Sequence, residues 1–100
     1  EKGGLPDDLF AEMTKPQNEA TPTVEWGLGF GIPKKDRNVL WHWGDNRGFK
    51  SFAVRDKVTG DGAVLCTNSD NGVDFYLPLL KLLTDGAFYD DVADFIAHAE

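Results

Sequence analysis

Four short apolar segments, separated by turns rich in glycine, proline, asparagine and aspartate, constrain the fold of this chain more than any other feature. The first segment, TVEWGLGFGI, alternates large apolar side chains with small or polar ones, which is the period of a β-strand with one buried face. The connections are too short for the helical crossover that parallel strands need, so we expect an antiparallel meander. The predicted strands are residues 23–32, 39–43, 49–57 and 63–69.

Helical patterns flank these strands. A short helix is predicted near the N-terminus, where Pro6 precedes two aspartates that suit a first turn. Residues 73–86 and 87–100 carry apolar residues at helical spacing, and Gly86 is the expected C-cap of the first of these two helices. The helices must bury their apolar faces against the sheet, so we predict an α+β fold in which residues 1–100 form a single domain.

Glycine occupies three alternate positions, Gly27, Gly29 and Gly31, on one face of the first predicted strand. Glycine weakens the interior of a strand, so this arrangement needs a reason. Either a large group packs or binds against that face, or the strand twists strongly there. The sequence leaves both explanations open.

The charge and hydropathy of the chain exclude two classes of partner. Seventeen acidic and ten basic residues give a formal net charge of −7, which does not suit nucleic-acid binding. The longest apolar run is far shorter than the roughly 20 residues of a membrane-spanning helix.

Cys66 is the only cysteine and lies in an apolar run, so we expect a small buried side chain and no internal disulfide. The chain starts Glu1-Lys2-Gly3-Gly4, and we expect it to be a piece of a longer protein.

No metal or other cofactor is expected. His42, His98 and Cys66 do not have the spacing of zinc ligands. Residues 68–74 place oxygen-bearing side chains at alternate positions, but they lack the glycine and glutamate of an EF-hand calcium loop. We interpret this segment as a connection between a strand and a helix.

His42 is the leading candidate for a functional residue. It alternates with Trp41 and Trp43, so its side chain lies on the opposite face of the strand from both indoles. Gly44 and the loop that follows it allow a ligand to approach the backbone at the end of the strand. A core histidine bonded to a backbone carbonyl is the alternative. A triad of His42, Ser51 and Asp45 can also be drawn on paper, but such trios often occur by chance.

Three motifs in this order resemble the C-terminal part of the serine β-lactamase-like proteins. They are W-G-L-G-F at residues 26–30, H-W-G-x-x-x-G-F at residues 42–49 and A-V-L-C-T-N at residues 63–68. The resemblance is greatest to the branch of class C β-lactamases, D-alanyl-D-alanine carboxypeptidases and esterases. It covers roughly residues 9 to 84.

The resemblance implies roles for particular residues. In that family the site combines Ser-x-x-Lys, a Tyr-x-Asn or Ser-x-Asn loop, and a third motif that is Lys-Thr-Gly or, in many esterases, His-x-Gly. The third motif would be His42-Trp43-Gly44, with His42 projecting toward the nucleophile and the N–H of Asp45 serving as the second oxyanion donor. Trp43 stands where the family usually has a small residue. The residues expected to bind substrate are Trp43, Asn46 and Arg47.

The other two motifs of the family are missing from this chain. Neither Ser51 nor Ser69 is followed by lysine three places later, and neither tyrosine is followed by asparagine two places later. Lys57-Val58-Thr59-Gly60 resembles Lys-Thr-Gly only superficially, because it falls in a predicted hairpin turn. We therefore expect a C-terminal segment of a larger domain, inactive by itself, whose partner is the missing N-terminal part of the same polypeptide. The substrate would be a β-lactam, a peptide or an ester, and related enzymes often work outside the cytoplasm.

Two other interpretations remain. The chain could be a non-catalytic module that binds a sugar or peptide on Trp26, Trp41 and Trp43, or an independent small fold whose resemblance is accidental. In the family fold, the strands of the missing part continue the sheet beside the last C-terminal strand. Without them, residues 63–69 would form an open apolar edge, and we expect the chain either to self-associate through this edge or to rely on its flanking helices to cover it.

Overall fold

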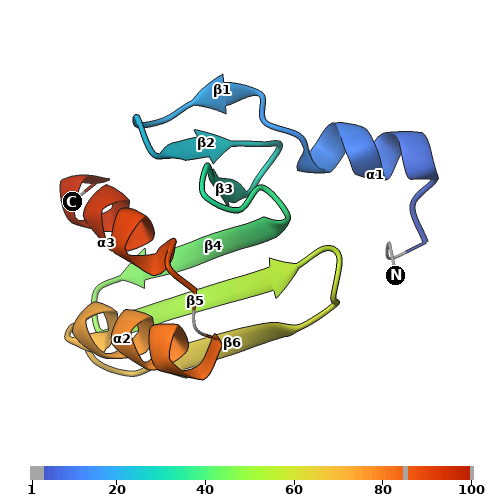
Figure 1. Ribbon diagram of the computed structural model, residues 1–100. Helices are drawn as coiled ribbons and strands as arrows, with labels where there is room; N and C mark the ends of the chain where they lie inside the picture. The colour runs from blue at the N-terminus through green and yellow to red at the C-terminus, as the bar shows by residue number, and fades with distance from the viewer. Residues whose placement is uncertain (1–3, 85, 100) are drawn as a thin grey trace.

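The computed structural model describes residues 4–84 and 86–99, and it confirms an α+β fold (Figure 1). The residues outside the described ranges are 1–3, 85 and 100. The predictions for the start of the chain and for the ends of both C-terminal helices fall partly on these residues. In chain order the elements are α1 (Asp7–Thr14), β1 (Asn18–Glu19), β2 (Val24–Trp26), β3 (Gly31–Pro33), β4 (Val39–Asn46), β5 (Phe49–Asp56), β6 (Gly62–Thr67), α2 (Gly72–Thr84) and α3 (Tyr89–Ala99).

The sheet is an antiparallel meander, as predicted, because its strand order follows the chain from β1 to β6. Its central part is the long hairpin of β4 and β5, in which Asn46 pairs with Phe49 across the two-residue loop of Arg47 and Gly48. Gly48 has a φ of 83°, a value that glycine adopts readily and that tight hairpin loops favour. The two-residue loop fixes the register of the whole hairpin.

The prediction of about four strands was too low, since the sheet has six. The predicted strand 23–32 is in fact two strands, β2 and β3, joined by a turn at residues 27–30. Gly27 N donates to Phe30 O at 2.8 Å, and Gly29 has a φ of 98°. The uninterrupted alternation of the sequence hides this turn, because each arm of a tight hairpin keeps the period of two. The sixth strand, β1, consists of only two polar residues, Asn18 and Glu19, and has no apolar period to reveal it.

The structure explains two of the three glycines, Gly31 and Gly29, and the explanation differs between them. Gly31 is buried, and any side chain added to it would run into the indole of Trp41. Gly29, by contrast, has open space around it and is required by its positive φ. Close packing therefore explains Gly31, and turn geometry explains Gly29.

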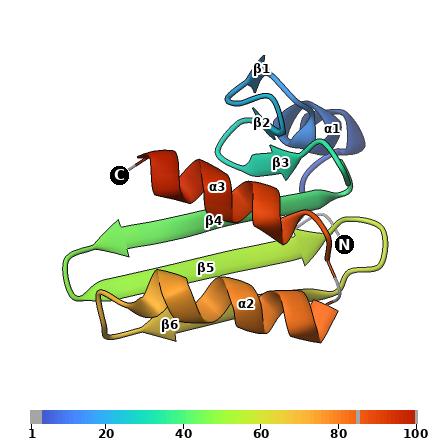
Figure 2. The ribbon, with the colours of Figure 1, turned by 60° about the vertical axis from the view of Figure 1, so that its left-hand side comes forward.

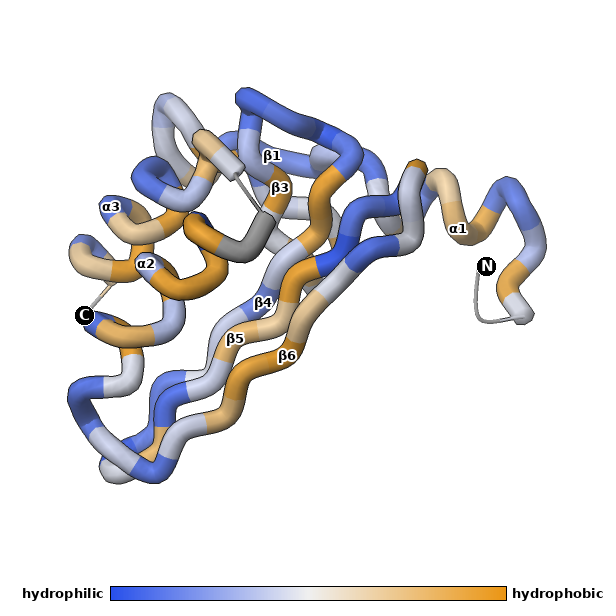
Figure 3. The backbone as a smooth tube through the Cα atoms, turned by 60° about the horizontal axis from the view of Figure 1, so that its bottom comes forward, coloured by the Kyte–Doolittle hydropathy of each residue, from blue (hydrophilic) through white to orange (hydrophobic). Residues whose placement is uncertain are grey.

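Helices α2 and α3 both lie on one face of the sheet (Figures 2 and 3). Aromatic rings dominate the core between them: Trp41 stacks on Phe52 at 5.6 Å between ring centroids, and Phe52 stacks on Tyr76 of α2 at 5.2 Å. The buried residues that form this core are Val24, Val39, Trp41, Phe52, Tyr76, Leu77, Leu80, Phe88, Tyr89, Val92 and Ile96.

The opposite face of the sheet is uncovered along β4, β5 and β6 (Figure 3). The alternation of β6 places Val64 and Cys66 on this face, and both are exposed. The prediction that Cys66 is buried was therefore wrong. An apolar run had suggested burial, but β6 is covered on one face only.

Candidate functional site

Strand β4 carries the candidate site, and its alternation separates the predicted residues into two sets. Trp41 and Trp43 pair with the core-facing residues Val54 and Phe52, so the odd-numbered side chains of β4 face the helices. The even-numbered positions, which include His42 and Gly44, face the uncovered side, and His42 is exposed. This is the arrangement that the sequence predicted for His42 relative to the two tryptophans.

Backbone groups of β4 alternate in a second direction, within the plane of the sheet. Lys57 N donates to Asn38 O at 2.8 Å, so residue 38 directs its backbone groups toward β5. Because this direction alternates along an antiparallel strand, the even-numbered residues of β4 also direct their N–H and C=O groups toward β5. The N–H groups of Trp43 and Asp45 consequently point toward the β3 side of β4. Strand β3 pairs with β4 only at Trp41, so both N–H groups lie past the point where β3 ends.

A shallow hollow of ≈ 560 Å³ lies on the uncovered face beside His42. The imidazole ring centroid is 5.9 Å from that of Trp26 and 5.9 Å from that of Trp43, and no described residue forms a hydrogen bond with the ring. The side chains that line the hollow with His42 are mainly apolar: Phe30, Leu40, Ala53, Arg55 and Val64. Among the described residues that line it, Arg55 is the only lysine or arginine, so the hollow suits an apolar group with a negative end.

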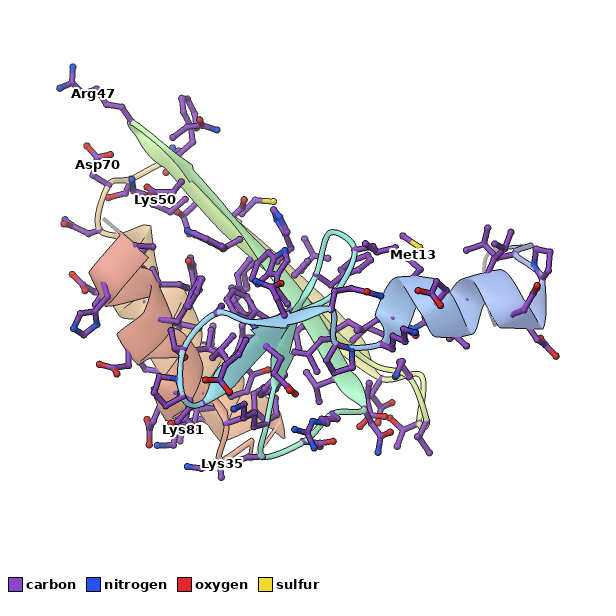
Figure 4. The ribbon with its side chains drawn as sticks, turned by 90° about the horizontal axis from the view of Figure 1, so that it is seen from above. Met13, Lys35, Arg47, Lys50, Asp70 and Lys81 are labelled. Atoms are coloured by element: carbon purple, nitrogen blue, oxygen red, sulfur yellow. The ribbon has the colours of Figure 1, made fainter. Side chains whose placement is uncertain are left out.

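The carboxylate of Asp45 lies on the helix side, where it forms an ion pair with Lys50. Lys50 Nζ is also 3.9 Å from Asp70 Oδ1, and Asp70 Oδ1 accepts a hydrogen bond from Gly48 N at 2.5 Å. Lys50 and Asp70 lie together at one end of the sheet, while Arg47 extends away from the molecule (Figure 4). This cluster ties the tip of the β4–β5 hairpin to the segment before α2.

The structure does not assemble the triad of His42, Ser51 and Asp45. Ser51 pairs with Gly44, and its hydroxyl occupies the space that a side chain at Gly44 would need. His42 and Ser51 are therefore diagonal neighbours on the uncovered face, where such neighbours are about 7–8 Å apart. The carboxylate of Asp45 is on the other face of the sheet, beside Lys50.

Trp43 packs among other aromatic rings. Its ring centroid is 5.6 Å from Phe95, 5.7 Å from Trp41 and 6.1 Å from Trp26, and its Nε1 is buried with no hydrogen-bond partner among the described residues. The indole thus stands on the helix side of β4, and the substrate-binding role predicted for Trp43 stays a prediction. Trp41 is only 1% exposed and offers no surface on which a sugar or peptide could stack.

Of the other residues predicted to bind substrate, Asn46 and Arg47 are exposed at the tip of the hairpin. The sequence analysis did not identify two further charged residues beside the candidate site. Arg55 lies opposite Leu40 across the hairpin, and Lys50 lies opposite Asp45. The two-residue loop was the signal that could have found both, because it fixes which residues of β4 and β5 are partners.

Among the described residues, no group of three or more histidine, cysteine, aspartate or glutamate side chains could hold a metal ion. Residues 68–71 connect β6 to α2, as the sequence predicted, whereas residues 72–74 already belong to α2. Within the connection, Ser69 Oγ accepts a hydrogen bond from Asn71 N at 3.1 Å. None of the described helices has the length and apolar character needed to cross a membrane. Comparison of the chain with models of protein families, with curated proteins and with solved structures finds no match.

Proposed function

We propose that this chain is the C-terminal part of a serine β-lactamase-like hydrolase and supplies one wall of its catalytic cleft. The observation that carries the proposal is the geometry of β4. The His42 side chain stands on the uncovered face of the sheet, while the Asp45 N–H points toward the β3-side edge of the same strand. This is the division of roles that the resemblance assigns to the His-x-Gly motif.

In the proposed reaction, a serine from an upstream Ser-x-x-Lys motif attacks the carbonyl of a β-lactam, peptide or ester. The acyl-serine that forms is then hydrolysed by water. His42 would take part in the proton network of the nucleophile or contact a substrate carboxylate, and the Asp45 N–H would donate to the oxyanion of the tetrahedral intermediate. Gly44 has no side chain and so leaves the uncovered face open beside His42, where only the Ser51 hydroxyl fills the space next to it among the described residues. Asn46 and Arg47 would contact the substrate from the hairpin tip.

The fold supports the same assignment in a second way. Helices α2 and α3 cover only one face of the sheet, so the face that carries His42 and its hollow has no cover among the described residues (Figure 3). A cleft needs a second wall, and the proposal assigns that wall to the upstream part of the polypeptide.

The test compares the 100-residue chain with the longer polypeptide that carries its upstream region, using a chromogenic cephalosporin and a chromogenic acyl ester. We expect no turnover by the chain alone, and acylation of a Ser-x-x-Lys serine in the longer polypeptide. There, His42→Ala should lower the rate by about 100-fold or more. The matched control is His98→Ala, because His98 is the other histidine and lies exposed near the end of α3.

Three outcomes would overturn the proposal. The first is turnover by the chain alone. The second is an upstream region without Ser-x-x-Lys. The third is a His42→Ala enzyme as active as the His98→Ala enzyme.

A further inference from the structure

Helix α2 has two apolar faces, and only one of them packs against the sheet. Tyr76, Leu77 and Leu80 are buried in the core. On the far side of the helix, Phe75 is 58% exposed and Leu82 is 83% exposed. With the half-buried Leu79 they form one row at helical spacing, the α2 stripe (Phe75, Leu79 and Leu82). A soluble helix that is apolar on both sides needs a second partner.

The charged residues of α2 leave the stripe uncharged. Between positions 72 and 82 they are Asp74 and Lys81. Lys81 Nζ lies 2.8 Å from Asp90 Oδ2 of α3, and Asp74 lines the groove between α2 and α3. Both charges thus stand on the side of α2 that faces α3. The stripe is on the other side, toward the end of the sheet.

Strand β6 forms that end of the sheet, and in the described part of the chain it pairs with β5 alone. Asp56 N donates to Asp61 O at 2.8 Å, so residues 61, 63, 65 and 67 direct their backbone groups toward β5. The backbone groups of Gly62, Val64 and Cys66 consequently point away from the sheet. Gly62–Thr67 contains no charged residue and no proline, which are the usual protection of an edge strand.

The stripe and the strand edge lie on the same side of the molecule. In Figure 2, α2 runs along β6 at the end of the sheet, and α3 lies nearer β4. Apolar segments of β6 and α2 are both visible in Figure 3. The strand edge and the helix face therefore belong to the same surface of the molecule.

We propose that this surface is the interface of a two-fold symmetric homodimer. Strand β6 pairs antiparallel with its copy, with Val64 opposite the partner's Val64 and Gly62 opposite the partner's Cys66. The outward N–H and C=O groups of both strands then satisfy one another. In this register Asp61 lies opposite the partner's Thr67, so like charges do not oppose each other. The inference concerns the 100-residue chain by itself and does not rest on the proposed function; in the longer polypeptide proposed above, the upstream strands would take the place of the partner's β6.

The spacing of the elements fits this arrangement. Helix α2 packs over both β5 and β6. With strands about 4.8 Å apart, the two α2 axes would lie about 10 Å from each other, the usual distance of packed helices. Along the strand, Thr67 touches Gly72, the first residue of α2, and Val64 is about 10 Å further back. About 10 Å of helix is seven residues, which ends at Leu79.

Leu79 therefore lies near the two-fold axis, opposite the partner's Leu79. Phe75 and Leu82 are almost equally distant from Leu79, on either side of it. The antiparallel copy brings Phe75 against the partner's Leu82, and Leu82 against the partner's Phe75. The stripe is thus complementary to itself, as a two-fold interface requires.

The first test is sedimentation equilibrium of the 100-residue chain from about 1 µM to about 1 mM. The expected result is a monomer–dimer equilibrium that reaches twice the 11.0 kDa of the chain. Val64→Lys should weaken dimerisation by about tenfold or more, because it places two ammonium groups opposite each other at the axis. Leu82→Lys should weaken it as well. The matched control is Val58→Lys, since Val58 is 72% exposed and Val64 is 70% exposed, yet Val58 lies in the β5–β6 turn.

Disulfide trapping tests the register. A Val64→Cys, Cys66→Ser double variant should cross-link on mild oxidation, because residues opposite each other in a strand pair have Cα atoms about 5.5 Å apart. Native Cys66 should not cross-link, since it lies about 13 Å along the strand from the partner's Cys66. A chain that stays monomeric at about 1 mM overturns the proposal. So does a dimer that Val64→Lys and Val58→Lys affect equally, or one trapped through Cys66 and not through Val64→Cys.

Discussion

Replacing Gly31 by alanine places a methyl group where the structure has no room for one. The added Cβ would lie 2.6 Å from both Cζ2 and Nε1 of the Trp41 indole. Trp41 cannot move aside easily, because four rings surround it at centroid distances of 5.5 to 5.7 Å. The φ of Gly31 is not positive, so the clash is with the indole and not with the backbone conformation.

The expected cost follows from two opposing effects. Forcing an extra methyl into a packed core costs about 1–3 kcal/mol, and the enclosed position of Trp41 favours the upper end of that range. Alanine restricts the unfolded chain more than glycine does, which raises the free energy of unfolding by about 0.4–1 kcal/mol. The net loss in the free energy of unfolding should be about 2 kcal/mol. For a domain of this size, that corresponds to a decrease in Tm of about 8–16 °C.

Urea denaturation followed by tryptophan fluorescence measures this loss, and a double-mutant cycle identifies its cause. In a Trp41→Phe background the smaller ring leaves room for the methyl, so the cost of Gly31→Ala should fall by about half. Gly29→Ala is the control: it should cost about 1–2 kcal/mol through its positive φ, with the same value in both backgrounds. The reasoning fails if Gly31→Ala costs less than about 0.5 kcal/mol or shows no coupling to Trp41.

Three shorter predictions concern charges and the thiol. Arg37 Nε donates to Glu25 Oε1 at 2.6 Å and holds the pKa of that carboxyl below its usual range, so this ion pair stabilises the fold above about pH 4.3 and the stabilisation is lost as the pH falls through the lowered pKa. Glu25→Gln should therefore weaken the dependence of the free energy of unfolding on acid pH, measured by urea titrations at several pH values. An unchanged slope would contradict this. Lys50→Met should lower the free energy of unfolding by about 1–2 kcal/mol, because it removes the cation paired with Asp45; chemical denaturation measures this, and a neutral result would show the pair to be without effect. Cys66 should react with iodoacetamide in the folded monomer at nearly the rate of the unfolded chain, because its thiol is exposed. A much slower reaction at low protein concentration would show that the thiol is buried in the monomer and would contradict this.

Periodicity predicted the elements whose side chains are sorted between core and solvent. Strands β4, β5 and β6 and helices α2 and α3 all fall within or close to their expected ranges. Periodicity failed at residues 27–30, because a tight turn between two short strands can preserve the alternation of apolar residues along the sequence. It also failed at β1, whose two residues pair through the backbone alone: Gln17 N, just before the strand, donates to Trp26 O at 2.8 Å.

The candidate site was only partly predictable for a related reason. Alternation sufficed to place His42 on the face opposite Trp41 and Trp43. It could not show that Asp45 turns its carboxylate to Lys50, because that contact depends on the pairing register of two strands. Nor could it show that one face of β6 is bare, since apolar composition does not distinguish a strand covered on both faces from one covered on a single face.

If the proposed function is correct, the geometry of β4 also defines where the catalytic serine must lie. A strand directs its side chains above and below the sheet, and its N–H groups sideways within it. His42 and Asp45 are three residues apart, about 10 Å along the strand. One offers an imidazole above the uncovered face, and the other directs its N–H toward the β3-side edge. A substrate and nucleophile that together contact both groups must span this distance across the corner where that face meets that edge, so a serine that served this site would come from a segment crossing this corner.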